Sequence, residues 1–199
     1  MQLRMRFVLA LLSLLLTSSV FAQGERSDFP NYGLGSLAIS STPGTQGGAA
    51  GAFWNPAAWA AMHGWEASFS WNDRNLIEHR MDDWGLFLGG HGLGFGMKRG
   101  TLVSPDTSFI EDYQFALGGG DPGWYWGLAY GWSKGRTDWL HRDQYLSWGA
   151  IYRPLRYLSI GSAASYGLND GDYRAILDAG VRPLGTHRVT AFADAAFGR

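Results

Sequence analysis

The 199-residue sequence contains no cysteine. This excludes disulfides, thiolate metal sites, a cysteine nucleophile and an N-terminal lipoprotein anchor. Charge is also scarce, because charged residues make up 17% of the chain, against roughly 25% in soluble domains. The 16 basic and 17 acidic side chains nearly cancel, so there is no basic field to hold nucleic acid, and we expect no nucleic-acid partner.

Glycine and aromatic residues are abundant by contrast. The chain has 29 glycines and 10 tryptophans, and aromatic residues make up 15% of it. With 46% hydrophobic residues, the composition is not that of a disordered chain. These values indicate a β structure rich in glycine and aromatic side chains.

The first 22 residues have the pattern of a secretory signal peptide. Arg4 and Arg6 precede an apolar run over residues 7–16, and residues 20–22 resemble a cleavage site. We therefore expect cleavage before Gln23 and export of the mature chain. The apolar run is shorter than the roughly 20 residues of a membrane-spanning helix, which disfavours an uncleaved anchor.

From Trp65 onward, apolar and polar residues alternate with the period of two that is typical of strands. Each alternating segment has about ten residues, which suits a tilted strand crossing a bilayer better than a strand of a soluble sheet. The nine segments span approximately residues 65–73, 80–88, 92–100, 109–118, 124–134, 143–153, 157–166, 173–182 and 187–197.

The alternation separates apolar and aromatic residues on one face from small and charged residues on the other. Aromatic residues at both ends of an apolar stripe are typical of the two interfaces of a membrane barrel. A soluble β-sandwich binding protein would bury this stripe instead, and the sequence leaves that alternative open. The predicted lipid-interface aromatic residues are Trp65, Trp71, Trp124, Trp126, Tyr130 and Trp132.

The links between these segments alternate between long and tight, as the loops and turns of outer-membrane barrels do. We therefore predict an all-β fold, an antiparallel up-and-down transmembrane β-barrel in the bacterial outer membrane. Its expected partners are the lipid bilayer and the barrel-insertion machinery. The tight links are predicted at residues 89–91, 119–123, 153–156 and 183–186.

Nine strands present a problem of parity. An up-and-down barrel closes between antiparallel edges only with an even number of strands. The sequence also ends at Arg199 without the terminal aromatic residue that is usual in outer-membrane proteins. We expect an incomplete barrel over residues 65–199, completed by residues 33–41 as a tenth strand, or by further strands or a fused domain downstream.

Residues 23–64 differ from the rest of the chain and are predicted to form a plug-like segment. Asn55 and Pro56 precede a short apolar run over residues 57–62, and both are signals of a helix start. One short helix is therefore expected there, ahead of the first strand.

Residues 47–57, Gly-Gly-Ala-Ala-Gly-Ala-Phe-Trp-Asn-Pro-Ala, resemble the N-terminal motif of PorV/FadL-like outer-membrane proteins. The matching core of the motif is Trp54, Asn55, Pro56 and Ala57, although family members usually continue Gly-Leu-Ala. The resemblance implies passage of apolar or small solutes, or anchoring of an export or processing partner. Similar barrels also occur at the N-terminus of signal-peptide-peptidase-like proteases, which gives an alternative.

Motifs with catalytic chemistry lack their structural context. Residues 131–135 match G-x-S-x-G, but that motif needs a strand-to-helix turn, and a polar loop is expected here. Residues 169–172 lack the glutamate that completes a calcium loop. We therefore expect no enzymatic activity, no metal and no cofactor.

Inward-facing charged residues remain as candidates for function. They carry both signs, which favours bracing of the wall over the single-sign ring of an ion filter. The lumen-facing candidates are Glu66, Asp112, Arg174, Asp178, Arg182, Arg188 and Asp194.

Overall fold

The computed structural model describes residues 47–72, 83–102, 108–135, 144–169, 171–182 and 191–198. Two short helices precede nine strands in this part of the chain. The helices are α2 (Gly48–Ala52) and α3 (Ala57–Ala61). The strands are β1 (Glu66–Asn72), β2 (Asp83–Gly90), β3 (Leu93–Leu102), β4 (Ser108–Asp121), β5 (Trp124–Gly135), β6 (Gln144–Leu155), β7 (Leu158–Gly167), β8 (Tyr173–Val181) and β9 (Ala191–Gly198).

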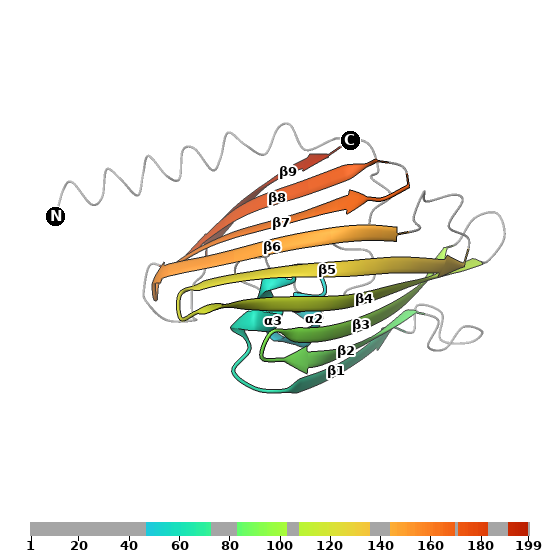
Figure 1. The fold of residues 1–199 in the computed structure, drawn as a ribbon, viewed down its shortest axis with the longest axis horizontal. Helices are drawn as coiled ribbons and strands as arrows, with labels where there is room; N and C mark the ends of the chain where they lie inside the picture. The colour runs from blue at the N-terminus through green and yellow to red at the C-terminus, as the bar shows by residue number, and fades with distance from the viewer. Residues whose placement is uncertain are drawn as a thin grey trace.

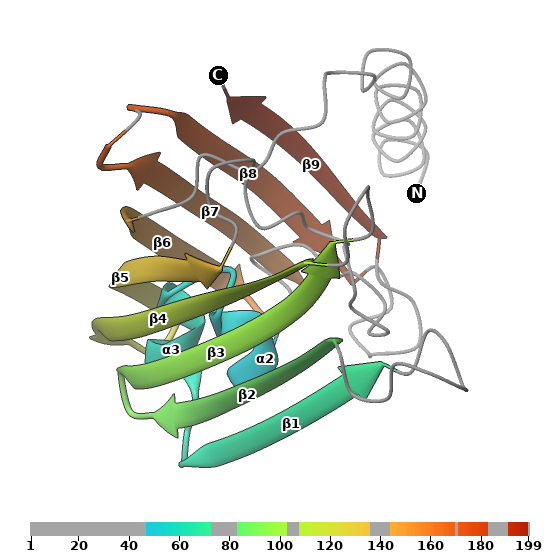
Figure 2. The same cartoon turned by 90° about the vertical axis from the view of Figure 1, so that its right-hand side faces the viewer.

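The strands form one antiparallel sheet in which each strand pairs with its neighbours in the sequence (Figure 1). The predicted nine-stranded, up-and-down, antiparallel β architecture is therefore confirmed. The sheet curves around α2 and α3 but is not closed, because the described parts of β1 and β9 do not pair with each other (Figure 2). Eight successive antiparallel pairings make β1 and β9 run in the same direction, so no antiparallel ladder can join them.

Three of the predicted tight links overlap two-residue turns, His91-Gly92, Pro122-Gly123 and Arg156-Tyr157, the first and third of which extend one residue beyond the predicted links. His91 and Gly92 both have positive φ, at 53° and 86°, as a type I′ hairpin turn requires. The three turns lie at the same end of the sheet, which we call the tight-turn end. The fourth predicted tight link, at residues 183–186, lies outside the described residues.

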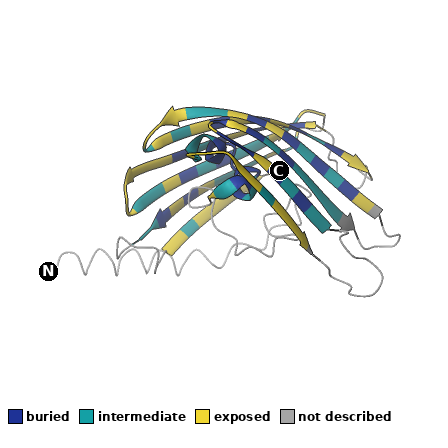
Figure 3. Cartoon of the chain, turned by 90° about the horizontal axis from the view of Figure 1, so that it is seen from below, coloured by how far each residue is buried: buried dark blue, intermediate teal, exposed yellow. Residues whose placement is uncertain are grey.

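Side chains along the strands alternate between the concave face, which contacts the helices, and the convex face. We call these the inner and outer faces. On β5, Trp124, Trp126 and Leu128 are exposed on the outer face, whereas Ala129 and Ser133 are buried on the inner face. Figure 3 shows similar alternation in other strands, and it agrees with the alternation that the sequence predicts.

The helix predicted after Asn55 and Pro56 is α3. The Oδ1 atom of Asn55 accepts a hydrogen bond from the backbone N–H of Ala57 at 3.1 Å. Pro56 is the N-cap residue of α3, so Asn55 lies one residue before the N-cap. The sequence did not predict α2, because glycine costs about 1 kcal/mol in a helix interior relative to alanine. None of the described helices is long and apolar enough to cross a membrane.

The hydrophobic core lies between these helices and the inner face of the sheet. The helices contact strands β1 to β6. Core side chains from the helical part include Phe53 and Trp59, and those from the strands include Phe87, Ala129 and Ile151. The sheet and the N-terminal helices therefore share one core.

Candidate functional site

The four predicted motif residues lie where the chain crosses the inner face. Asn55, Pro56 and Ala57 are fully buried, and Trp54 is half-buried. They belong to residues 47–64, which we call the helical segment. The Nζ atom of Lys98 on β3 lies 5.0 Å from the centroid of the Trp54 ring, a cation–π contact that the sequence did not reveal.

Glycines on the inner face give the helical segment room to approach the sheet. A β-carbon on Gly127 of β5 would overlap the backbone carbonyl of Pro56, and one on Gly149 of β6 would overlap the side-chain oxygen of Asn55. Glycine at such positions allows the close approach of another backbone. The strand alternation predicts inward glycines. It does not predict that Asn55 and Pro56 pack directly against them.

Trp59 anchors α3 against the tight-turn end of β2 and β3. Its side chain is completely buried, and β-carbons on Gly89 or Gly94 would overlap its ring. Its carbonyl oxygen accepts the backbone N–H of Gly92 at 3.0 Å, which ties the helix to the β2–β3 turn. Its indole Nε1 has no hydrogen-bond partner within the described residues. Trp59 was not among the predicted site residues.

Asp112 is the predicted lumen-facing residue with the best-defined contact. It lies on the inner face of β4, 3% exposed, and accepts a hydrogen bond from the Ser133 hydroxyl at 2.7 Å. Ser133 belongs to the G-x-S-x-G match, and β5 continues as a strand to Gly135 instead of turning into a helix. The pair therefore braces β4 against β5.

The other charged candidates are spread over the inner face. Asp178 is 4% exposed and lies opposite Asp194 in the pairing of β8 with β9. Arg174 and Arg182 are half-buried on or next to β8. Arg188 lies outside the described residues. The structure therefore places Asp178 and Asp194 together, but the described candidates do not form one ring.

A small cavity of about 40 Å³ lies between Trp54 and the inner face of β4, β6, β7 and β8. The Ser147 and Ser165 hydroxyls lie in its wall, 2.8 Å apart. Gln114 also lines it, and the buried Oε1 atom of Gln114 has no hydrogen-bond partner within the described residues. The cavity has room and polar groups for about one water molecule.

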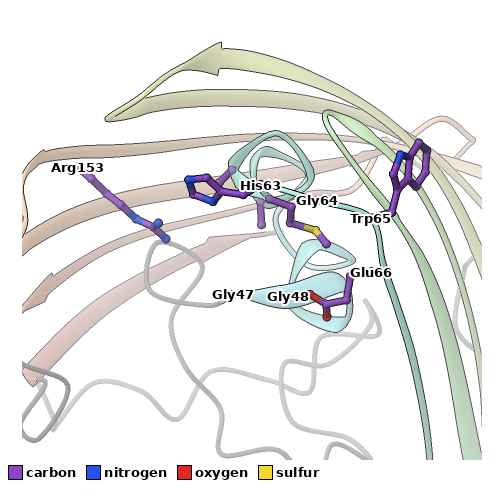
Figure 4. A pocket seen from close by; sticks show the side chains of 10 residues that line it. Gly47, Gly48, His63, Gly64, Trp65, Glu66 and Arg153 are labelled. Carbon is purple, nitrogen blue, oxygen red and sulfur yellow. The ribbon is translucent and has the colours of Figure 1, made fainter.

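A larger pocket of about 350 Å³ opens between the helical segment, the start of β1 and Arg153 of β6 (Figure 4). It lies at the tight-turn end of the sheet. In Figure 4, Arg153 reaches toward the pocket from one side and Glu66 lies on the other, with His63 between them. The Oε1 atom of Glu66 accepts the backbone N–H of Ala49 at 2.9 Å, so this predicted lumen-facing residue also holds α2.

The outer face has aromatic residues near both ends. Trp65, Trp124 and Trp126 lie near the tight-turn end, whereas Trp71 and Trp132 lie near the opposite end. Tyr130 lies two residues before Trp132 on the same face. These are the predicted interface residues, and other exposed aromatic residues of the outer face, such as Trp148, lie between the two ends.

Charged residues of the outer face gather at the end opposite the tight turns. Arg99, Glu111 and Lys134 lie side by side on β3, β4 and β5. Arg99 pairs with Glu111 at 3.4 Å, and Lys134 lies 5.5 Å from the Tyr113 ring centroid. The Tyr113 hydroxyl donates to Glu111 at 2.8 Å. These contacts neutralise or cover the charges within the sheet surface.

Comparison with known proteins gives no match to a family model, a curated protein or a solved structure. The resemblance of residues 47–57 to PorV/FadL-like proteins therefore stays a prediction.

Proposed function

We propose that the chain forms the wall and the plug of an outer-membrane β-barrel that passes small solutes. The observation that carries this proposal is the charge distribution on the outer face. Between Asp121 at the tight-turn end and the row Arg99, Glu111 and Lys134 at the other end, the described outer side chains are uncharged. A basic side chain facing lipid at the bilayer midplane would cost roughly 2–4 kcal/mol, so a lipid-facing band must lack such charges.

The large apolar side chains of this band also support an outer face that contacts lipid. Leu128, Trp148 and Leu177 are among many that remain exposed on the described outer face. An apolar surface of this extent needs a covering, because soluble monomers rarely expose contiguous apolar patches above a few hundred Å². In the proposal, lipid tails cover the band, and the aromatic residues at its two ends lie at the membrane interfaces.

The inner face favours an open lumen that passes solutes and disfavours a completely filled interior. The helices contact β1 to β6, so the inner faces of β7 to β9 continue beyond them. Ser165 and Arg174 line the small cavity against Trp54, whereas Asp194 on β9 is an exposed charged group of the wall beyond the helices. In the proposal, small polar solutes pass beside Asp194, along the part of the inner face that Trp54 does not cover.

A closed lumen requires more strands than the sheet contains. Because β1 and β9 run in the same direction, an odd number of added strands restores antiparallel pairing throughout. The proposal assigns this role to residues 33–41 or to further strands of the assembled protein. The periplasmic side is then the tight-turn end, as in other outer-membrane barrels.

Cell fractionation tests the proposal. The protein, expressed with its own N-terminus in a Gram-negative host, should begin at Gln23 and be recovered in the outer-membrane fraction after carbonate extraction. Recovery in the soluble periplasm would overturn the proposal and favour a soluble β protein that buries its apolar face by other means.

A further inference from the structure

One row of the outer face brings tryptophan and charged side chains together. The pairings of β1 to β5 place one residue from each strand side by side, at the end opposite the tight turns. Tryptophan and basic side chains favour the boundary between the acyl chains and the headgroups of a membrane. In strand order, the row is Trp71, Trp84, Arg99, Glu111 and Lys134.

The charges of this row do not cancel. Both carboxylate oxygens of Glu111 are engaged, because Arg99 Nη1 lies 3.4 Å from Oε1 and the Tyr113 hydroxyl donates to Oε2 at 2.8 Å. Lys134 is exposed, and its contact within the described residues is with the Tyr113 ring, not with a carboxylate. The row therefore has one positive charge in excess, and this charge lies at Lys134.

An apolar column runs along β4 and β5 from this row toward the tight-turn end. At its upper end, the Tyr113 and Trp132 rings stack with their centroids 5.3 Å apart. A cation above an exposed apolar column fits an amphipathic ligand, with an anionic group at the cation and an apolar chain along the column. The column consists of Tyr113, Phe115 and Leu117 on β4 and Trp132, Tyr130 and Leu128 on β5.

We infer that this surface binds a membrane lipid with an anionic phosphate headgroup. Lys134 attracts the phosphate as a compact point charge, and an acyl chain lies along the column. A lipid fits this surface better than free phosphate does, because only a lipid also covers the apolar side chains. An anionic lipid fits better than a zwitterionic one, whose own cation opposes Lys134.

This inference names a lipid partner of the proposed outer-membrane wall and rests on that function. In the proposed orientation, the tight-turn end is periplasmic, so the row lies in the opposite leaflet. The experiment below separates failure of the inference from failure of the function, because it measures lipid contact and lipid preference in the same sample.

The test measures which lipid is enriched beside Lys134. A fluorescent label on Gln144→Cys reports on this surface, because Gln144 is exposed and pairs with Trp132 across β5 and β6. The purified protein is inserted into phosphatidylcholine vesicles with a minor amount of a nitroxide-bearing quencher lipid, either phosphatidic acid or phosphatidylcholine. Phosphatidic acid should quench about five times more strongly, the factor that one basic side chain near an anionic membrane surface supplies.

A label on Leu177→Cys of β8 is the positional control. Leu177 is exposed on the outer face, and the described outer side chains of β8 are uncharged. Both quencher lipids should therefore quench this label equally. A fivefold preference at residue 177 as well would show that phosphatidic acid gathers around the whole protein, and would overturn the inference.

Three charge variants, each in the Gln144→Cys background, assign the preference. Lys134→Gln should reduce the ratio of the two quenching slopes to about one. Lys98→Gln, the same substitution on the inner face of β3, should leave the ratio unchanged. Glu111→Gln removes the negative charge of the row and keeps an oxygen for the Tyr113 hydroxyl, so it should raise the ratio above that of the parent.

The outcomes are distinct. Equal quenching by the two lipids at residue 144 would overturn the inference and leave the lipid-facing wall intact. Equal loss of preference in Lys98→Gln and Lys134→Gln would also overturn it, because the net charge of the protein would then attract the lipid. Absence of quenching by either lipid at both labelled residues would overturn the proposed function, and the inference with it.

Discussion

Gly149 of β6 lies against the side-chain oxygen of Asn55, so closely that a β-carbon on Gly149 would overlap it. The same oxygen accepts the N–H of Ala57 at the start of α3. One small residue in the sheet therefore allows the turn that begins the helix to rest on the strand. The helical segment and the wall are joined at this point.

Gly149→Ala should destabilise the protein by about 1–3 kcal/mol, because a methyl group forced into a packed contact displaces its neighbours. The measurement is the free energy of unfolding by urea in detergent micelles. Gly100→Ala is the matched control, since its added β-carbon would meet only an Asp83 oxygen at 3.9 Å. Equal stability of the two variants would contradict the close packing of Asn55 against Gly149.

The strands and their order could be predicted because their signal is local. Alternation along β5 assigns Trp124, Trp126 and Leu128 to one face without any knowledge of the neighbouring strands. The tight link predicted at residues 89–91 likewise marks this hairpin, although the turn itself is His91-Gly92. The inner position of Asp112 follows from the same alternation.

Other features depend on contacts between residues distant in sequence and could not be predicted. The five residues of α2 have weak helix propensity, and packing of Ala49 and Ala52 in the shared core stabilises them. The packing of the Trp59 ring against Gly89 and Gly94 requires the curvature of the sheet, which no single segment encodes. The pocket between Glu66 and Arg153 joins residues of β1 and β6, which are distant in the sequence, for the same reason.

Trp59 provides a second test of the core. Trp59→Ala should cost roughly 3–5 kcal/mol of unfolding free energy, because it empties the space between α3 and the sheet. Trp59→Phe should cost much less, since the indole Nε1 has no hydrogen bond to lose within the described structure. Trp65→Ala, at a side chain that is 70% exposed, is the control and should change the urea midpoint little in lipid-free detergent. A Trp59→Ala variant as stable as Trp65→Ala would show that α3 does not pack on the sheet.

Leu177 tests the lipid face. Leu177→Arg should destabilise the protein in lipid vesicles by roughly 2–4 kcal/mol, the cost of a basic side chain near the bilayer midplane. The control is Ala196→Arg, because Ala196 of β9 lies on the inner face opposite Ile176 and is exposed. Ala129 is a poor inward control, since it packs in the core beneath the helices. Equal costs at residues 177 and 196, measured by urea unfolding from vesicles, would contradict the assignment of faces.

The open sheet predicts the behaviour of residues 23–199 on gels. Without an added strand between β1 and β9, the protein should migrate in SDS at the same position before and after boiling. Addition of a strand-forming segment that pairs with β9 should produce the heat-modifiable shift of a closed barrel. A compact, heat-modifiable monomer made from residues 23–199 alone would contradict closure by further strands and would assign it to residues 33–41.

The central claim is that the outer face contacts lipid, and a cysteine scan of β9 tests it most directly. Because the chain has no cysteine, each variant at residues 193–197 carries one unique site for a fluorescent label. In vesicles, we predict that a lipid-borne quencher reduces the fluorescence of labels at residues 193, 195 and 197, whereas aqueous iodide reduces it at the exposed inner residues 194 and 196. Quenching by iodide at all five positions, or a pattern without alternation, would contradict the claim.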